Sequence, residues 1–458
     1  MDKLHLIQKD GEYFVYIPSS YDIVKVNKLT YNVVLQLISG QAKSDICKIY
    51  NIERSDIEKM EAYFRNLSVN HSSPSRTHCL KSNERVIDRI TVHVSNDCNL
   101  RCKYCYASGG NYQSPKKLMS EDTAEAFVDF CIREFSEVRN IVFFGGEPLL
   151  NPSEILHICQ LFEYNYKVGK IRVLPKFGAI TNGTIMSPLI MEIIKTHFSF
   201  ITVSIDGPKS INDFNRVDKN GNGCFSRISK FIKNVRNISN LDIQYEATYT
   251  ESHLKMGYTR ENIHKFMHET FHIAGNVLDE YNMEKNSILD ERSYYSAEDI
   301  VNHKYPEGFW SIIQTLVTKH PKTMCQLYWQ NLSVSVDGDI YPCHMNVGTK
   351  NCCLGNIKSH NAYAVPQDFL SNHPGIAEGF KNNKICNDCW ARNLCGGCSR
   401  LWFYDEYCQN YSSLPNRSIC ERNNKHLENI LISIYNLKAN PSKWKSFFSE
   451  HLCKKNQN

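Results

Sequence analysis

Three cysteines close together in the chain, Cys98, Cys102 and Cys105, have the spacing of ligands for an iron–sulfur cluster. Three residues separate the first pair, two separate the second, and the loop follows an apolar segment that reads as a strand. A [4Fe–4S] cluster normally takes four Cys ligands, so a loop with three leaves one iron able to bind another molecule. The alternatives are a zinc knuckle and a set of buried thiols. Zinc would require a fourth Cys or His close by, and the next cysteine is Cys131.

The segments that must position this loop alternate between strand and helix from residue 86 to about 280. The patterns predict strands at 86–95, 140–144, 176–181, 200–205 and 242–249. Helices are predicted between them at 122–135, 153–168, 188–196 and 225–238. Repeated strand–helix units predict an α/β fold with a parallel sheet, either open or a partial barrel. Active sites lie at the C-terminal ends of such strands, where the cysteine loop also lies.

A second motif ends the next strand along the chain. Gly145-Gly146-Glu147-Pro148 follows the cysteine loop by one strand–helix unit. Together the two motifs resemble the signatures of the radical S-adenosylmethionine (SAM) enzymes, over residues 86 to about 280. The resemblance implies a partial (β/α)6 barrel, with SAM chelated by the open iron of a [4Fe–4S] cluster. An electron from that cluster then splits SAM into methionine and a 5′-deoxyadenosyl radical.

The resemblance also implies which residues bind SAM. Glu147 is expected near the methionine ammonium group, Tyr104 beside the adenine and Arg216 at the SAM carboxylate, although Asn212 stands where the family usually has His. Three further residues at strand ends are expected to line the ribose and methionine. The full cofactor-binding set is Tyr104, Gly145, Gly146, Glu147, Pro148, Asn182, Ser204, Asp206 and Arg216.

The C-terminal third of the chain holds a second group of cysteines. Their order and spacing resemble the SPASM domain, which carries two auxiliary [4Fe–4S] clusters and brings the expected total to three. The resemblance assigns the outer cluster to Cys386, Cys389, Cys395 and Cys420, and the inner cluster to Cys325, Cys343 and Cys398. A zinc ribbon would explain four of these cysteines and leave the others unused.

Some ligand assignments in this domain have rivals. Cys395 and Cys398 are separated by two residues where the family usually has three, and Cys408 competes with Cys420. Relatives with a closed inner site have an extra Cys before the position of Cys325, and residues 319–324 contain none. We therefore expect an open inner site that can bind a substrate thiolate, unless Cys352 or Cys353 closes it.

Residues 1–70 are expected to form a separate α+β module. Strands at 13–17 and 22–26 precede three helical patterns, an order that suggests a three-stranded sheet with a winged-helix-like arrangement. By size, order and position the module resembles the RiPP recognition element, which binds the leader of a ribosomally made precursor peptide by strand addition. The expected lining is Val24, Val26 and residues of 56–67. The alternative is a DNA-binding winged helix, but helix 56–67 begins with acidic residues.

Composition limits the cellular location and the kinds of partner that we expect for this protein. The chain has 458 residues, a net charge of +5 and 19 cysteines, with neither a membrane-span pattern nor a secretory signal pattern. We therefore expect a cytoplasmic protein that binds metal and has neither nucleic acid nor membrane as a partner. The predicted domains are 1–70, a linker at 71–85, a radical SAM core at 86–300, a SPASM domain at 301–430, and a helix and tail at 431–458.

These expectations combine into one functional hypothesis. The chain is identified as a member of the radical SAM/SPASM peptide maturases, most similar to those that form Cys thioethers in ranthipeptides. A ferredoxin- or flavodoxin-type protein would supply electrons. Alternatives with the same fold are carbon–carbon crosslinking, epimerisation using Cys224 or Cys408, and formylglycine formation. A more distant alternative is an iron–sulfur redox sensor. The sequence identifies no general base.

Overall fold

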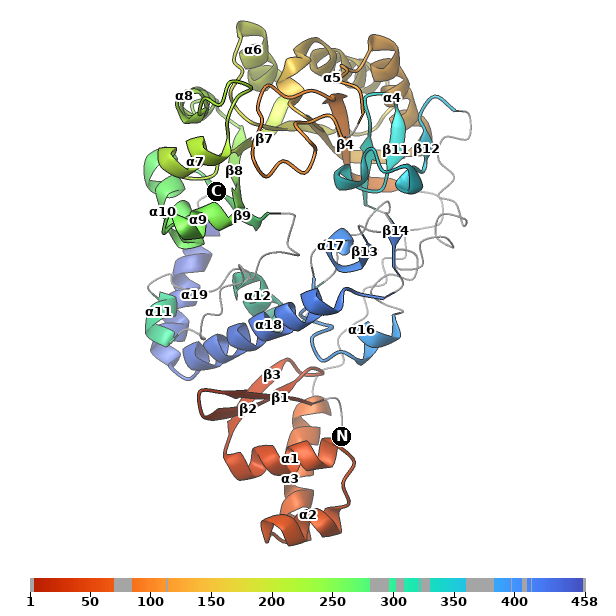
Figure 1. Cartoon of the computed structure of the whole chain (residues 1–458). Coiled ribbons are helices and arrows are strands. Elements are labelled where there is room, and N and C mark those ends of the chain that lie inside the picture. The colour runs from red at the N-terminus through yellow and green to blue at the C-terminus, as the bar shows by residue number, and fades with distance from the viewer. Residues whose placement is uncertain are drawn as a thin grey trace.

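The structure is a computed structural model that describes most of the chain. The described residues are 4–69, 85–112, 114–280, 296–301, 309–319, 321–322, 330–359, 383–396, 398–405, 410–412 and 414–455. The large α/β domain lies at one end of the molecule and the N-terminal module at the other, with a layer of C-terminal helices between them (Figure 1). No helix in these ranges is both long and apolar enough to cross a membrane.

The N-terminal module is a three-stranded antiparallel sheet followed by three helices. The strands are β1 (His5–Lys9), β2 (Glu12–Ile17) and β3 (Asp22–Val26), in spatial order β1-β2-β3, and the helices are α1 (Lys28–Ile38), α2 (Lys43–Tyr50) and α3 (Arg54–Val69). Asn27 begins α1 by accepting a 2.8 Å hydrogen bond from the Thr30 amide, and Asn51 ends α2 in the left-handed conformation. The two strands and three helices predicted here are confirmed.

A nine-stranded sheet forms the centre of the α/β domain. Six parallel strands follow one another in chain order: β4 (Val86–Ser95), β5 (Glu137–Gly145), β6 (Lys176–Thr181), β7 (Phe198–Ser204), β8 (Asp242–Tyr249) and β9 (Ala274–Asp279). The first five correspond to the predicted strands. The sixth lies in the polar stretch after residue 255, where the sequence shows no clear strand pattern.

Helices cover the outer face of this sheet (Figure 1). The longer ones are α4 (Glu121–Glu134), α5 (Pro152–Lys167), α6 (Pro188–His197), α8 (Phe225–Val235) and α10 (Arg260–Phe271), and the short ones are α7 (Lys209–Asn215) and α9 (Glu251–Lys255). On β4 the buried Ile90, Val92 and Val94 join Phe127 and Phe130 of α4 in the main core. Because side chains alternate along a strand, Thr91, His93 and Ser95 face the opposite, inner side.

The C-terminal region extends the same sheet. Strand β10 (Asn331–Val334) pairs in parallel with β4, followed by β11 (Asp339–Tyr341) and β12 (Gly355–Asn356). Strands β10 and β11 form a hairpin through Asp337-Gly338, a turn signal readable in the sequence, and Gly338 has the positive φ of +89° that such a turn favours. Its addition to the edge of the parallel sheet was not anticipated, because the sequence does not show which strands become neighbours.

The remaining described elements form the helical layer. They are α11 (Ala297–Val301), α12 (Phe309–Thr318), α16 (Lys384–Asp388), α17 (Ser399–Phe403), α18 (Arg417–Lys438) and α19 (Pro441–Lys455), with short strands β13 (Tyr404–Asp405) and β14 (Asn410–Tyr411). The domain boundaries stay predictions. The one proposed between residues 430 and 431 would fall inside α18, which is continuous.

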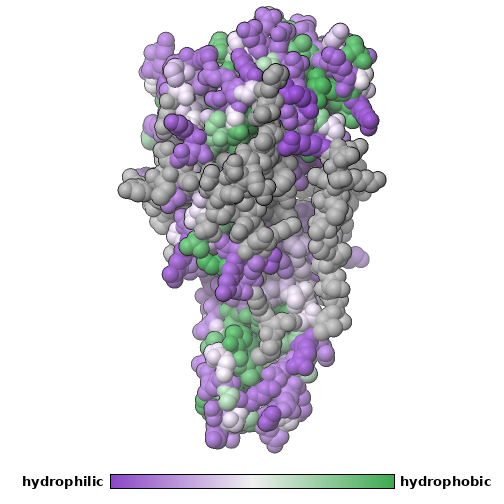
Figure 2. Space-filling view, turned by 90° about the vertical axis from the view of Figure 1, so that its right-hand side faces the viewer, coloured by the Kyte–Doolittle hydropathy of each residue, from purple (hydrophilic) through white to green (hydrophobic). Residues whose placement is uncertain are grey.

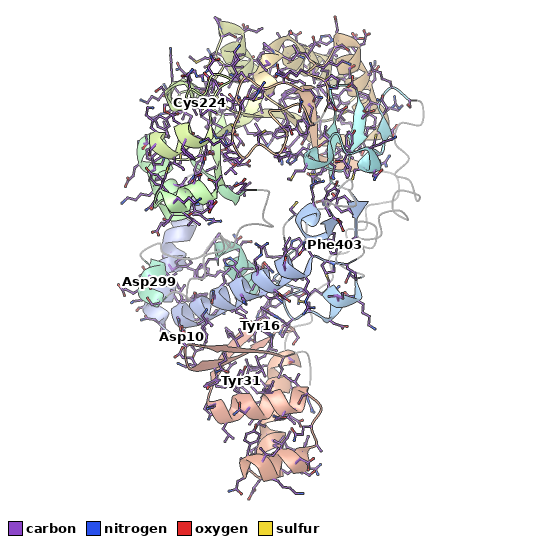
Figure 3. The ribbon with its side chains drawn as sticks, in the orientation of Figure 1. Asp10, Tyr16, Tyr31, Cys224, Asp299 and Phe403 are labelled. Atoms are coloured by element: carbon purple, nitrogen blue, oxygen red, sulfur yellow. The ribbon has the colours of Figure 1, made fainter. Side chains whose placement is uncertain are left out.

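One face of the N-terminal sheet packs on this layer (Figure 1). The His5 ring stacks on Trp390 with centroids 3.8 Å apart, and Tyr16 meets the same indole edge-on at 5.8 Å. Phe14 contacts Tyr435 of α18 in the same way. Tyr16 therefore points toward the helical layer, as Figure 3 also shows. These contacts anchor the N-terminal module to the C-terminal region at Trp390, the residue directly after Cys389.

Candidate functional site

The cysteine loop lies at the C-terminal end of β4, and its three thiols are neighbours. The charge of Cys102 would be influenced by both Cys98 and Cys105. Burial is the largest effect and raises the pKa of both Cys98 and Cys102 to about 12. Backbone amides point at the sulfurs: the Leu100 N–H donates to Cys98 at 3.4 Å and the Gly109 N–H donates to Cys105 at 3.4 Å.

The Gly145-Gly146 turn packs directly against this loop. The Gly146 amide donates to the Ser95 carbonyl at 2.8 Å, and the Glu147 amide donates to the Asp97 carbonyl at 2.8 Å. A Cβ on Gly146 would lie 2.2 Å from the Asp97 oxygen, and one on Gly145 would lie 2.1 Å from the Ser95 oxygen. The glycines therefore allow two protein loops to meet, and their contact with SAM stays a prediction.

The Glu147 carboxylate is fully buried and held by three donors. It accepts hydrogen bonds from the Thr181 hydroxyl at 2.6 Å, the Asn182 amide at 2.7 Å and the Leu149 amide at 3.0 Å. Burial raises the pKa of Glu147 to about 7, against the effect of these hydrogen bonds. Its side chain thus ties the end of β5 to the end of β6. Contact with the SAM ammonium group stays a prediction.

Asp206 and Arg216 form a buried ion pair below the loop. Arg216 Nε lies 2.9 Å from an Asp206 oxygen, and both side chains are almost inaccessible to solvent. The Tyr104 hydroxyl also donates to Asp206 at 2.9 Å, and the Thr248 amide donates at 3.2 Å. Asn212, in the place where the family has His, accepts a 3.2 Å hydrogen bond from the Asp206 amide. The strand ends thus bring Tyr104, Asp206 and Arg216 together beside the cysteine loop.

The other predicted SAM residues also lie at these strand ends. Ser204 is the last residue of β7 and is partly exposed, while Pro148 is buried at the start of a short helix, Pro148–Leu150. The Asn182 side chain is directed at Cys98, with Nδ2 3.6 Å from its sulfur. Cys224, an alternative hydrogen-atom donor, is buried near the upper helices (Figure 3), and its thiol donates to the Arg216 carbonyl at 3.3 Å. A buried thiol is poorly placed to donate a hydrogen atom to a bound peptide, so the burial of Cys224 disfavours that role.

The four cysteines predicted for the outer cluster gather in one place. The charge of Cys395 would be influenced by Cys386, Cys389 and Cys420 together, and burial raises the pKa of Cys395 to about 12. They come from α16, the turn after it, and the first turn of α18. Cys408, the rival of Cys420, lies outside the described residues. The grouping is compatible with one four-ligand site.

The inner site is described only in part, because Cys325 also lies outside the described residues. Cys343 follows β11 and accepts a hydrogen bond from the Met345 amide at 3.5 Å, and Cys398 precedes α17. Cys352 is buried and accepts from Asn346 Nδ2 at 3.5 Å, whereas the Cys353 thiol donates to the Gly355 carbonyl at 3.4 Å. Cys352 and Cys353 both stay candidates for the fourth ligand of the inner cluster.

Tyr106, which the sequence analysis did not single out, lies between the two kinds of cysteine site. Its pKa is raised mainly by burial, and Cys105, Cys343 and Glu246 all contribute to the potential at its hydroxyl. The side chain nevertheless keeps 40% of its surface exposed. Its position directly after Cys105 was the only available signal, because nothing in the sequence places Cys343 nearby.

His93 is an unusual polar residue of the inner face of β4. It is fully buried, and its two ring nitrogens have no hydrogen-bond partner among the described residues. Tyr112 and Phe144 contact the ring edge-on. Burial, with a smaller contribution from His344, lowers the pKa of His93 to about 3.

We therefore expect His93 to destabilise the fold in acid. Its folded pKa of about 3 lies below the ordinary value of 6.5, so the unfolded chain binds a proton that the folded chain excludes between these pH values. Near pH 5 the loss of unfolding free energy is about 2 kcal/mol. Urea unfolding under anaerobic conditions near pH 7.5 and near pH 5 should show a smaller drop in His93→Phe than in the wild type. An equal drop in both would contradict the assignment. The exposed His268→Gln is the control.

Comparison with known proteins supports this description. A model of the radical SAM superfamily matches residues 92–269, and a model of the SPASM iron–sulfur cluster-binding domain matches residues 325–390. The cysteine-type anaerobic sulfatase-maturating enzyme of Clostridium perfringens is 27% identical over 361 residues, which are 69% of this chain and 92% of that protein. The radical SAM cyclopropyl synthase TigE of Paramaledivibacter caminithermalis is 22% identical over 447 residues, covering 87% of this chain and 88% of that protein.

A solved structure shows the same fold. Native anSMEcpe with bound AdoMet and Cp18Cys peptide matches with a TM-score of 0.57 at 21% identity, covering 76% of this chain and 99% of that one. The parallel sheet with its cysteine loop and the two family matches lead to one conclusion. The protein has the radical SAM α/β fold with a C-terminal SPASM domain and is a radical SAM enzyme, similar to enzymes that modify proteins and peptides.

Proposed function

We propose that this enzyme oxidises a ribosomally made precursor peptide and joins a peptide Cys to a peptide carbon through a thioether. The observation that carries the proposal is the position of Tyr106, which directly follows Cys105 and whose hydroxyl lies 3.4 Å from that of Tyr112. Tyr112 in turn packs against the segment after Cys343, since a Cβ on Gly348 would lie 2.4 Å from the Tyr112 carbonyl oxygen. A substrate beside Tyr106 would therefore be close to both sites. The Clostridium perfringens relative matures a sulfatase, and the anSMEcpe structure contains a peptide.

The residues present fit the cofactors that the fold implies. Three neighbouring thiols at the end of β4 can hold three irons of a [4Fe–4S] cluster, and the four gathered thiols of the C-terminal domain can hold another. The inner set would hold a third. Arg216, anchored by Asp206, supplies a positive charge beside Cys102 for a carboxylate. When bound, SAM and the reduced cluster supply a radical that removes a hydrogen atom from a substrate carbon.

Thioether formation removes a second hydrogen from the peptide, as a proton and an electron. The hydrogen atom leaves the carbon and the proton leaves the thiol. The C-terminal cysteines would hold iron–sulfur clusters able to accept the electron, and a ferredoxin- or flavodoxin-type protein is the proposed final acceptor. The protein must therefore provide a proton acceptor near Tyr106.

Glu246 on strand β8 is the candidate for this proton acceptor. Tyr249 on this strand donates to the Tyr258 carbonyl at 2.8 Å, and Tyr245 binds His264 of α10, so these side chains face the helices. Because successive side chains of a strand point to opposite faces, Glu246 and Thr248 lie on the inner face of the sheet. There the Thr248 hydroxyl forms a hydrogen bond with Tyr104. Glu246 keeps some solvent exposure although its strand is paired on both sides.

The surroundings of Glu246 suit proton transfer. Burial raises its pKa, and the positive charges of Arg216 and Arg89 act in the opposite direction. In addition to burial, its negative charge contributes to raising the pKa of Tyr106, which agrees with a position on the same inner face. We propose Glu246 as the proton acceptor, since a carboxylate with a raised pKa is an effective base near neutral pH.

Replacing this carboxylate should separate SAM cleavage from product formation. In Glu246→Gln we expect the rate of crosslinking to fall about 100-fold or more, because an amide cannot accept the proton. The 5′-deoxyadenosine yield should fall much less. Both products are quantified in one anaerobic reaction by liquid chromatography and mass spectrometry. Asp242→Asn, an exposed change on the same strand, is the matched control. Unchanged crosslinking in Glu246→Gln would refute the assignment.

The N-terminal module is proposed to bind the leader of the precursor as a RiPP recognition element. Within the described residues β3 is an edge strand, paired only with β2, so an extended peptide can add beside it. Val24, Val26, Met60 and Leu67 are partly buried around a small core between this sheet and α3. Figure 2 shows hydrophobic residues on the surface of the N-terminal module, in the lower part of the view. We propose, accordingly, a peptide partner and a cytoplasmic location, where ribosomally made precursors arise.

Thiol counting tests the chemistry. A Cys-containing precursor encoded near the gene is incubated anaerobically with reduced protein and SAM, alkylated, and analysed by mass spectrometry. Thioether formation predicts the loss of two hydrogens and of one alkylatable thiol per event. Loss of two hydrogens with all thiols retained would indicate a carbon–carbon bond instead. Loss of the sulfur itself would favour formylglycine, the second candidate, which the similarity to a cysteine-type maturase supports.

A further inference from the structure

Three polar residues form a closed set of hydrogen bonds beside Cys98. Asn99 Nδ2 donates to the Thr184 hydroxyl at 2.7 Å, and that hydroxyl donates to Asn182 Oδ1 at 2.6 Å. Asn182 Nδ2 closes the set by donating to Asn99 Oδ1 at 2.9 Å, and it also lies 3.6 Å from the Cys98 sulfur. The loop after β4 and the end of β6, about 85 positions apart in the chain, are thereby joined at one cysteine.

The network fixes which end of the Asn182 amide faces the sulfur. Asn182 Oδ1 accepts from both the Thr184 amide, at 3.0 Å, and the Thr184 hydroxyl. An amide oxygen that takes these two donors leaves the NH2 group to face Asn99 and Cys98. Rotating the amide by half a turn would place its NH2 group against the Thr184 N–H and the oxygen against sulfur, so the observed orientation is strongly preferred.

The backbone at Asn182 is held as firmly as its side chain. Its amide donates to the buried Glu147 carboxylate at 2.7 Å. The next residue, Gly183, has a φ of +63°, and a Cβ there would lie 2.9 Å from Val203. This turn therefore requires glycine and aims residues 182 and 184 back at the cysteine loop.

A rigid N–H group beside a cluster ligand has a known physical effect. An N–H donor withdraws negative charge from a thiolate sulfur, which stabilises the more negative, reduced form of an iron–sulfur cluster. Cys98 receives two such donors, the Leu100 amide and the Asn182 side chain. Only the second comes from outside the loop and can be removed by substitution.

We propose that Asn182, oriented by Thr184 and Asn99, is a positioning residue for the Cys98 corner of the radical SAM cluster and raises the reduction potential of that cluster. The inference goes beyond the proposed function, since it holds whatever product the enzyme makes. It also assigns Asn182 a role other than the contact with SAM predicted from the sequence.

The test is a reductive titration of the reconstituted protein without SAM, followed by electron paramagnetic resonance. The signal of this cluster is identified by its absence in Cys98→Ala. We expect a lower midpoint potential in Asn182→Ala and a still lower one in Asn182→Asp, which adds negative charge. Thr184→Val should shift the potential in the same direction, because the amide loses its orienting hydroxyl, whereas Thr184→Ser retains that hydroxyl and should match the wild type.

Two results would overturn the proposal. One is an unchanged potential in Asn182→Ala and Asn182→Asp at full iron content. The other is a loss of SAM affinity in these variants with the potential unchanged, which would return Asn182 to the SAM-contact role. If the Asn182 variants fail to assemble the cluster, the Thr184→Val and Thr184→Ser pair decides, and equal potentials for these two would refute the account.

Discussion

Cys98→Ala is expected to abolish reductive cleavage of SAM. Cys98 is one of three neighbouring thiols at the end of β4, and it receives hydrogen bonds from Leu100 and Asn182 that a smaller side chain cannot replace. Changes next to metal ligands cost up to about 100-fold in activity, so removing a ligand should cost more than that. The measurement is 5′-deoxyadenosine formed anaerobically with dithionite as reductant.

The control for Cys98→Ala is another single thiol loss far from the site. Cys47 lies in α2 of the N-terminal module, and Cys47→Ala should retain wild-type SAM cleavage. The result also separates an enzyme from an iron–sulfur sensor, which has no need of SAM. Cleavage that persists in Cys98→Ala at near wild-type rate would contradict the assignment of this loop.

Cys386→Ala is expected to affect the product far more than SAM cleavage. Cys386, Cys389, Cys395 and Cys420 are grouped in the C-terminal region, apart from the loop that carries Cys98. Losing one of them should damage the outer site and block the exit of the second electron. We expect crosslinked peptide to fall about 10-fold or more, as for damage to a metal site, while uncoupled 5′-deoxyadenosine formation continues.

Iron content and peptide mass are measured on the same preparation of Cys386→Ala. Iron should fall by one cluster relative to the wild type. The exposed neighbour Lys384 provides a control, because Lys384→Ala changes the same short helix without removing a thiol. Full product yield from Cys386→Ala would count against an auxiliary cluster at this site.

The sequence predicts much of this fold because its strongest signals are local. Strands β4 to β7 contain apolar segments, β8 alternates polar and apolar residues, and the Asp337-Gly338 sequence favours a hairpin turn. Strand β9 has no such pattern: it begins Ala274-Gly275-Asn276, and a Cβ on Gly275 would lie 2.0 Å from the Tyr245 carbonyl oxygen. Gly275 lets two backbones approach closely, but a glycine adds nothing to the apolar pattern by which a strand is recognised in a sequence.

The candidate site was predicted only at the level of motifs. The cysteine loop and Gly145-Gly146-Glu147 are contiguous in the chain, so spacing alone reveals them. The hydrogen bonds that define the site join residues far apart: Tyr104 meets Asp206 across about 102 positions, and Asn182 meets Cys98 across about 84. Only the register of the parallel strands brings them together, so these contacts cannot be read from motif spacing.

The most direct test of the account is the transfer of hydrogen from peptide to cofactor. Reduced protein is incubated anaerobically with SAM and a precursor peptide deuterated at its carbon positions, and the 5′-deoxyadenosine is analysed by mass spectrometry. The account predicts one deuterium in the 5′-deoxyadenosine for each crosslink formed, with matching loss from the peptide. Product formation with 5′-deoxyadenosine free of deuterium would contradict it, because the peptide carbon would then not be the site of hydrogen abstraction.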